Sequence, residues 1–174
     1  NGYLALKSVF TSEECERILT VCESQADESF RAIMHIERKT PEIWGVIKDP
    51  RIVSVIEALH NAEMCSLGSQ VLFKQAGSRY EEQSWRVHQD NAYVKARYGT
   101  YISAIMPLQD SDPENGGMFI YPGSHREEIL PYEEYGSFNP SVNPGYELKM
   151  PDKYNKLDLI MPQGSLYLQH GNLI

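Results

Sequence analysis

Apolar residues in the first sixty positions recur mainly with the 3.6-residue period of an α-helix. Residues 3–6 form a short apolar run, which predicts a strand. Thr11 and Glu14 then stand at the spacing of a capping box, which marks the start of a helix. The apolar residues that follow share one helix face: Cys15, Ile18, Leu19 and Cys22. This pattern predicts an amphipathic helix whose two cysteines are buried in the core.

A second helix is predicted to begin at Asp49-Pro50. Asp49 is a good N-cap residue, and proline is favoured at the first helical position. The helix ends near His60, which is expected to interact with the C-terminal end of the helix dipole. Its buried stripe is expected to contain Ile52, Val53, Ile56 and Leu59. The segment 26–40 has a mixed pattern that fits a strand or a short helix, and His35 within it is expected to be a structural or surface residue.

From residue 69 onward the pattern changes to short apolar runs separated by turn residues. Strands or apolar strand-like runs are predicted over 69–74, 101–106, 118–121, 157–161 and 165–170, with one more strand ending at His88. Residues 130–155 are rich in Pro, Tyr, Gly and Asn, which is typical of a long surface loop or lid. Two helices followed by many short strands predict an α+β domain whose β part is a sandwich or barrel. A double-sheet jelly roll is favoured because it limits exposed strand edges.

The chemical signal in this pattern lies in the run from Trp85 to Asp90. In a strand, residues i and i+2 project from the same face, so His88 and Asp90 are predicted to lie together, with Gln89 on the other face. An imidazole and a carboxylate are two of the three ligands of a 2-His-1-carboxylate site, which holds Fe(II) and leaves positions open. By itself, a histidine beside an aspartate is more often a surface ion pair than a metal site.

Length, charge and cysteine content limit the classes of protein to which this chain can belong. With 174 residues, the chain is long enough for one domain with a sizeable core. A net charge of −8 argues against nucleic acid or an anionic membrane as a partner, and no apolar run reaches membrane-spanning length. The three cysteines lack metal-binding spacing, which predicts reduced thiols in a cytoplasmic protein. Phosphate-binding glycine loops and the GxSxG motif are absent from the sequence, so nucleotide binding through such loops and serine-hydrolase chemistry have no support.

Three motifs, in this order and spacing, resemble the phytanoyl-CoA dioxygenase family: His88-Gln89-Asp90, Asp112-Pro113-Glu114-Asn115-Gly116-Gly117 and Tyr121-Pro122-Gly123-Ser124-His125. The resemblance covers nearly the whole chain. It implies a double-stranded β-helix (jelly roll, cupin-like) with N-terminal flanking helices, in a single domain over 1–174 that is truncated at both ends. Within it, 1–65 would be the helical flank and 66–174 the β core. The implied activity is an Fe(II)- and 2-oxoglutarate-dependent dioxygenase that uses O2 to hydroxylate an unactivated C–H bond of a small organic substrate.

The resemblance also implies roles for individual residues. The first two iron ligands fall on His88 and Asp90, and a contact to 2-oxoglutarate falls on Gln70. Relatives that halogenate carry a small residue in place of Asp90, so the chain resembles the hydroxylating branch. An aromatic residue common in relatives on the next strand is replaced by Ile105. The glycine-rich turns are expected to be structural, with His125 as a hydrogen-bonding turn residue rather than a ligand.

The third iron ligand is expected just beyond the given sequence. In the family it follows a Gly-Asp or Gly-Ser turn, and Gly164-Ser165 fits that turn. Counting from this turn places the distal histidine directly after Ile174, and the arginine that binds 2-oxoglutarate further on. His170 is the second choice. The strand period places it on the same face as Leu166 and Leu168, as a packed residue.

Two alternatives stay open. One is a jelly-roll metalloenzyme that does not use 2-oxoglutarate, such as a cupin-type dioxygenase or isomerase. The other is a non-catalytic binding domain with the same fold. The long loop 130–155 is placed to cover a pocket, and Arg79, Lys95 and Arg97 are placed to meet an anionic substrate, although such residues are usually solvated loop charges. The pattern indicates no particular substrate or oligomeric state.

Overall fold

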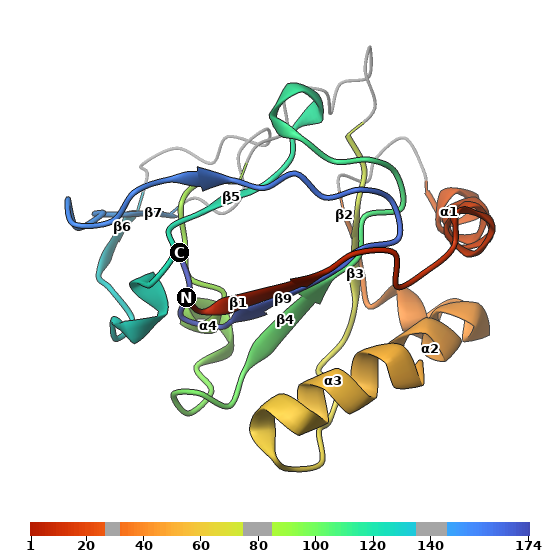
Figure 1. Cartoon of the computed structure of the whole chain (residues 1–174), viewed down its shortest axis with the longest axis horizontal. Coiled ribbons are helices and arrows are strands. Elements are labelled where there is room, and N and C mark those ends of the chain that lie inside the picture. The colour runs from red at the N-terminus through yellow and green to blue at the C-terminus, as the bar shows by residue number, and fades with distance from the viewer. Residues whose placement is uncertain (27–31, 75–84, 135–145) are drawn as a thin grey trace.

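A three-stranded antiparallel sheet lies at the centre of the computed structural model, which describes residues 1–26, 32–74, 85–134 and 146–174 (Figure 1). Strands β1 (Tyr3–Leu6) and β4 (Ile102–Ile105) pair with the two edges of β9 (Leu166–His170). The backbone of residues 121–123 hydrogen-bonds to both Asn1 and Ile174. The first strand and the last strand described are therefore neighbours, and the two ends of the chain lie close together.

The other strands form three antiparallel pairs: β2 (Ala32–Met34) with β3 (Gln70–Leu72), β5 (Phe119–Ile120) with β8 (Leu157–Asp158), and β6 (Tyr132–Glu134) with β7 (Tyr146–Leu148). The α-helices are α1 (Ser12–Ser24), α2 (Pro41–Ile47), α3 (Pro50–His60) and α4 (Asn91–Val94). Short 3₁₀ turns lie at Ile36–Arg38, Pro113–Asn115 and Ser124–Arg126. The predicted helical flank 1–65 thus also contains β1 and β2, each paired with a strand of the predicted β core.

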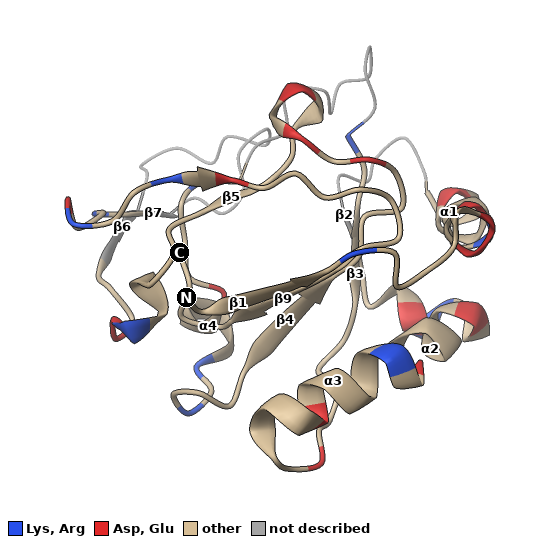
Figure 2. Ribbon diagram, viewed as in Figure 1, with Lys and Arg blue, Asp and Glu red and all other residues tan. Residues whose placement is uncertain are grey.

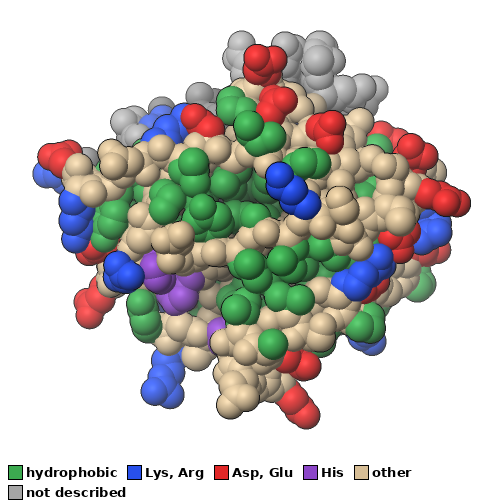
Figure 3. Space-filling view, viewed as in Figure 1, with side chains coloured by type: hydrophobic (Ala, Val, Ile, Leu, Met, Phe, Trp, Pro, Cys, Tyr) green, Lys and Arg blue, Asp and Glu red, His purple; other side chains and the backbone are tan. Residues whose placement is uncertain are grey.

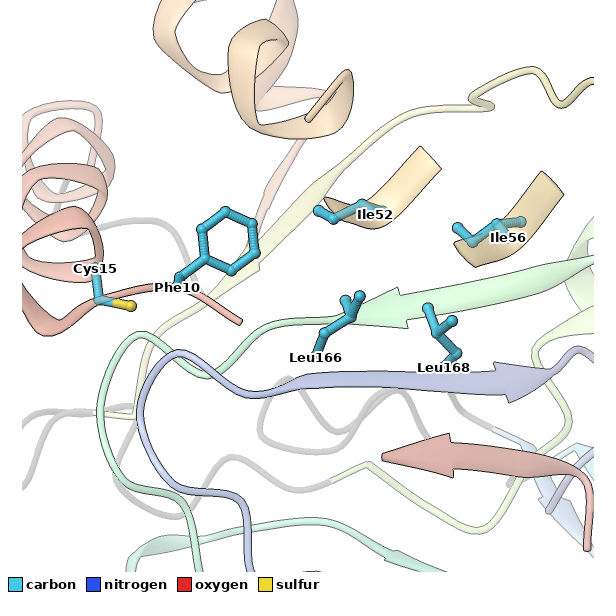
Figure 4. Packing of buried hydrophobic residues seen from close by; sticks show 6 residues of the cluster. All are labelled: Phe10, Cys15, Ile52, Ile56, Leu166 and Leu168. Carbon is cyan, nitrogen blue, oxygen red and sulfur yellow. The ribbon is translucent and has the colours of Figure 1, made fainter. Parts of the chain in front are cut away.

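One face of the central sheet packs on the helices. Leu166 and Leu168 of β9 are 0% and 2% exposed. Figure 4 shows six side chains of this cluster converging from the start of α1, from α3 and from β9: Phe10, Cys15, Ile52, Ile56, Leu166 and Leu168. Each large apolar side chain buried in this way stabilises the fold by roughly 1.5–3 kcal/mol.

The opposite face of the sheet packs on β5 and β8. Tyr167, which alternates with Leu166 and Leu168, is 1% exposed and belongs to a second cluster with Ile120, Leu159, Met161 and Leu173. Figure 3 shows apolar side chains gathered over the middle of this view, between β5 and the sheet. Apolar side chains therefore pack in the space between the two layers of strands. Strand β9 has an alternating pattern, with its odd-numbered residues facing this interior.

Both predicted helix starts are confirmed. The Thr11 side chain accepts from the Glu14 amide while the Glu14 side chain accepts from the Thr11 amide, and the Asp49 side chain accepts from the Arg51 amide. The predicted burial of Leu59 is wrong, since it is 54% exposed near the end of α3. Helix α2 was not predicted: Ile43 is buried and Val46 and Ile47 pack beside it on the core, but seven residues are too few for a stripe that repeats over several turns.

Acidic side chains gather on α1 and around the 3₁₀ turn before β5, whereas basic side chains are scattered (Figure 2). Both acidic regions lie on elements that are largely exposed. Among the described residues, the helices are too short and too polar to cross a membrane.

An ion-pair cluster joins the starts of α1 and α3. The guanidinium of Arg51 donates to Glu14 at 2.9 Å and to Asp49 at 2.7 Å. Hydrogen bonding to Arg51 is the main cause that lowers the pKa of Glu14 from 4.5 to about 2. A carboxylate whose pKa is lower in the folded state stabilises the protein above its unfolded pKa, and loses this effect as the pH falls through the folded value.

We therefore expect Arg51→Gln to lower the free energy of unfolding at pH 7, and to do so progressively less as the pH falls from about 4.5 toward 2. Urea unfolding of both proteins at pH 7, 4 and 2.5 measures the difference. Arg51 also stacks on the Phe10 ring, 4.1 Å from its centroid. A difference that stayed constant down to pH 2.5 would mean that this packing, rather than charge, is the contribution of Arg51.

Candidate metal centre

His88 and Asp90 lie side by side, but they are not held by a strand. Residues 85–89 are irregular, and Asp90 has the helical angles φ −56° and ψ −36° directly before α4. The predicted strand end is wrong because the chain turns here into α4, and the Asn91 amide donates to the Gly171 carbonyl. This turn nevertheless places His88 Nε2 3.1 Å from Asp90 Oδ1. The two side chains therefore lie together as predicted, but a turn brings them together rather than the alternation of a strand.

The ring of His88 is fixed by its other nitrogen. Nδ1 lies 2.6 Å from the backbone oxygen of Arg86. A carbonyl only accepts, so Nδ1 carries a proton and donates it. In the neutral ring, Nε2 then directs a lone pair at the Asp90 carboxylate. Two acceptors at this distance require a positive charge between them, either a second proton on His88 or a metal ion.

Asp90 is held from its other side. Its Oδ2 accepts from Ser103 Oγ at 2.5 Å and from Gln169 Nε2 at 2.8 Å. Burial acts to raise the pKa of Asp90, but His88 and these two donors outweigh it and lower that pKa below its usual value. Burial likewise acts to lower the pKa of His88, and hydrogen bonding to Asp90 outweighs it and raises that pKa. The pair thus offers an ionised carboxylate beside an imidazole.

The geometry of the pair fits a divalent metal. Two ligand atoms at right angles around one small ion, each with a bond of roughly 2.1 Å, lie about 3 Å apart. The side chains of His88 and Asp90 are 23% and 24% exposed, so the pair is accessible from outside. An imidazole whose second nitrogen is held by a carbonyl is the usual arrangement of a histidine ligand. No group of three metal-ligating side chains occurs within the described ranges, so the pair would supply two of the ligands.

Within the described residues, the other predicted site residues make no hydrogen bond to this pair. Gln70 is exposed on β3, where it pairs with Met34. His170 alternates with Gln169 along β9 and thus projects from the opposite face of the strand. Its Nδ1 accepts from the Asn172 amide at 3.0 Å, and its ring lies 5.0 Å from that of Tyr98. Arg79 lies outside the described residues.

Several polar residues of the site were missed by sequence reasoning. Ser103 and Gln169 are polar residues within strands that were predicted to be apolar. This interruption of the apolar pattern was the signal that could have indicated a role in the site. Two rings also flank His88, because the Trp85 and Tyr93 rings both lie 5.8 Å from the imidazole. These two rings therefore lie beside the His88–Asp90 pair.

Behind the pair lies a buried amide cluster formed by Gln89, Asn91 and Asn172, which are 0%, 3% and 2% exposed. Gln89 Nε2 donates to the carbonyls of Glu128 and Asn172, and its Oε1 accepts from the Leu130 amide. Asn91 Nδ2 donates to Asn172 Oδ1 at 2.9 Å. The buried amide cluster therefore connects the turn that carries His88 and Asp90 to the segment after β9.

The hydroxyl of Tyr167 is buried without a hydrogen-bond partner in the described parts of the chain. An unpaired buried hydroxyl costs about 1–3 kcal/mol of desolvation. Tyr167→Phe keeps the ring and removes the hydroxyl, so we expect unchanged stability or a gain of up to about 1 kcal/mol in urea unfolding. Tyr154→Phe is the control, because it removes a hydroxyl that donates to Glu127. A clear loss of stability in Tyr167→Phe would mean that a bound water or ligand pairs with this hydroxyl.

The structure is a mixed α/β fold in which an imidazole and a carboxylate lie side by side, with 3.1 Å between His88 Nε2 and Asp90 Oδ1. The chain belongs to the phytanoyl-CoA dioxygenase family, whose sequence model matches residues 1–174. This confirms the family predicted from the three motifs.

The relatives with named activities or solved structures share only a small part of their sequence with this chain. An ectoine dioxygenase from Bordetella parapertussis is 22% identical over 147 residues, which cover 74% of this chain and 47% of the relative. The chain thus spans about half the length of the curated relatives it matches.

Among solved structures, EctD from S. alaskensis with 2-oxoglutarate and 5-hydroxyectoine has a TM-score of 0.74 and 18% identity, covering 99% of this chain and 64% of its own. The epimerase SnoN, in complex with Fe3+, alpha ketoglutarate and nogalamycin RO, has a TM-score of 0.72 and 16% identity, covering 99% and 71%. This likeness shows that the chain shares the fold of these proteins. Iron, as Fe3+, and alpha ketoglutarate are bound in SnoN, and iron with 2-oxoglutarate is the pair of cofactors that the resemblance implies.

Proposed function

We propose that the full-length protein is an Fe(II)- and 2-oxoglutarate-dependent dioxygenase that hydroxylates a small organic substrate, with His88 and Asp90 as two of the iron ligands. The observation that carries the proposal is the 3.1 Å approach of His88 Nε2 to Asp90 Oδ1, with His88 Nδ1 bound to a carbonyl. Family membership over the whole chain supports it. The interior between the central sheet and β5–β8 would be that of a jelly roll.

When bound, iron with 2-oxoglutarate and O2 supplies the oxidation of an unactivated C–H bond, coupled to decarboxylation of the 2-oxoglutarate. The residues of this chain would bind the metal and orient its ligands. The Arg86 carbonyl holds the His88 ring so that Nε2 is available to the metal, and Asp90 contributes the negative charge. The Trp85 and Tyr93 rings, beside His88, would exclude water from one side of the site.

The remaining parts of the site are proposals that follow from the family. The third iron ligand would follow Ile174 in the full-length protein; His170 stays the second choice, although it projects from the face of β9 opposite to Gln169. Gln70 would contact 2-oxoglutarate, which requires the exposed face of β2–β3 to line the site. The relatives named above include an epimerase as well as a dioxygenase, so the outcome of the reaction has to be measured.

An anaerobic titration of the full-length protein with Fe(II) and 2-oxoglutarate tests the proposal. A visible charge-transfer band that requires both components is the expected result. The same titration on residues 1–174 then tests the ligand after Ile174, because a band there would favour His170. Metal binding without any change on adding 2-oxoglutarate would instead favour a metalloenzyme of another type. Absence of metal binding would favour a non-catalytic binding domain.

A further inference from the structure

Asp90 receives two hydrogen bonds on one oxygen from two neighbouring strands. Ser103 on β4 and Gln169 on β9 are directly opposite one another in the sheet. Both donate to Asp90 Oδ2, while Asp90 Oδ1 is the oxygen that approaches His88. The two oxygens of the carboxylate are therefore in different environments.

This difference limits how Asp90 can bind a metal. A carboxylate oxygen has about two lone-pair sites, and the two donors occupy both sites on Oδ2. Oδ1 keeps a lone pair for a cation. The donors also belong to paired strands, with Gln169 only 9% exposed, so the sheet fixes the backbone that carries each donor.

A carboxylate that binds a metal through both oxygens takes one more coordination position than a carboxylate that binds through one. Fe(II) sites of the 2-His-1-carboxylate class depend on open positions for their substrates. A residue that withholds the second oxygen therefore preserves a position at the metal.

From this geometry we propose that Ser103 and Gln169 are positioning residues that restrict Asp90 to binding the metal through Oδ1 alone. The proposal rests on the proposed function, since it requires a metal at His88 and Asp90. It assigns the strand pair β4–β9 a role in the coordination of the metal in addition to its role in the fold.

The variants Ser103→Ala and Gln169→Met remove one donor each with little change in volume. Ser103→Thr keeps the hydroxyl and serves as the rescuing variant. Ser165→Ala is the matched control, because Ser165 is a buried serine whose hydroxyl has no hydrogen-bond partner in the described part of the structure. Thermal unfolding of each metal-free variant identifies any loss of metal binding that is due to misfolding.

Mn(II) binding to the full-length protein is the measurement, followed by the relaxation of water protons, which reports the number of waters on the bound ion. We expect Ser103→Ala and Gln169→Met to weaken Mn(II) binding by about 10–100-fold, as is typical of groups that orient a ligand. We also expect each variant to hold fewer waters on the ion. Ser103→Thr and Ser165→Ala should behave as the wild type does.

Wild-type affinity and water number in both Ser103→Ala and Gln169→Met would overturn the positioning role while leaving the proposed function intact. A wild-type protein that fails to bind Mn(II) would instead overturn the proposed function itself. If Gln169→Met does not fold, the comparison of Ser103→Ala with Ser103→Thr decides the matter, because these differ in the hydroxyl donor at the same position.

Discussion

Replacing either His88 or Asp90 with alanine is expected to abolish turnover and to weaken Fe(II) binding by more than about 100-fold. Loss of a group that merely orients a ligand already costs about 10–100-fold in metal affinity, and a ligand contributes more than its orienting partner. Each variant also leaves the other member of the pair without the charge it faces across 3.1 Å. Fe(II) affinity and consumption of 2-oxoglutarate by the full-length protein provide the measurements.

The control for these two variants is His60→Ala, which removes a histidine at the end of α3. It should retain the affinity and activity of the wild type. Retained turnover in either His88→Ala or Asp90→Ala would remove the assignment of the metal centre to this pair.

The largest expected effect on stability comes from the buried amide cluster. Gln89→Leu is similar in size but leaves the carbonyls of Glu128 and Asn172 and the amide of Leu130 without their partner. Each unpaired buried group costs about 1–3 kcal/mol, so we expect a loss of roughly 3–5 kcal/mol in the free energy of unfolding. Urea unfolding measures this loss.

Gln163→Leu is the matched control. Gln163 is partly exposed, and its side chain makes one hydrogen bond, to the Leu108 carbonyl. Water can replace that partner, so we expect a loss below about 1 kcal/mol. If the two glutamine variants were equally stable, the hydrogen bonds of the amide cluster would contribute little to the fold.

Local sequence signals predicted local structure well. The capping box at Thr11 and the Asp49-Pro50 start are confirmed because their hydrogen bonds form between residues two or three positions apart. The alternation of Leu166 and Leu168 with Tyr167 is likewise visible from the period of a strand.

The polar surroundings of Asp90 could not be predicted in the same way. Ser103 and Gln169 meet because β4 and β9 pair in one particular register, between segments far apart in the chain. That register cannot be read from a single sequence, and a slip of one residue would turn one of the two side chains to the other face of the sheet. The pairing of His88 with Asp90 was predicted because the two residues are close in sequence, although a turn replaced the expected strand.

The position of β9 between β1 and β4 has a consequence for biosynthesis. Leu4 pairs with Leu168, so the central sheet cannot form until nearly all of the described chain has left the ribosome. Strand β1 therefore waits through most of translation with its edge unpaired, and pairings across such long sequence separations form slowly. Gln169 lies on the same strand, so the Asp90 carboxylate can obtain its complete set of partners only after β9 has been synthesised.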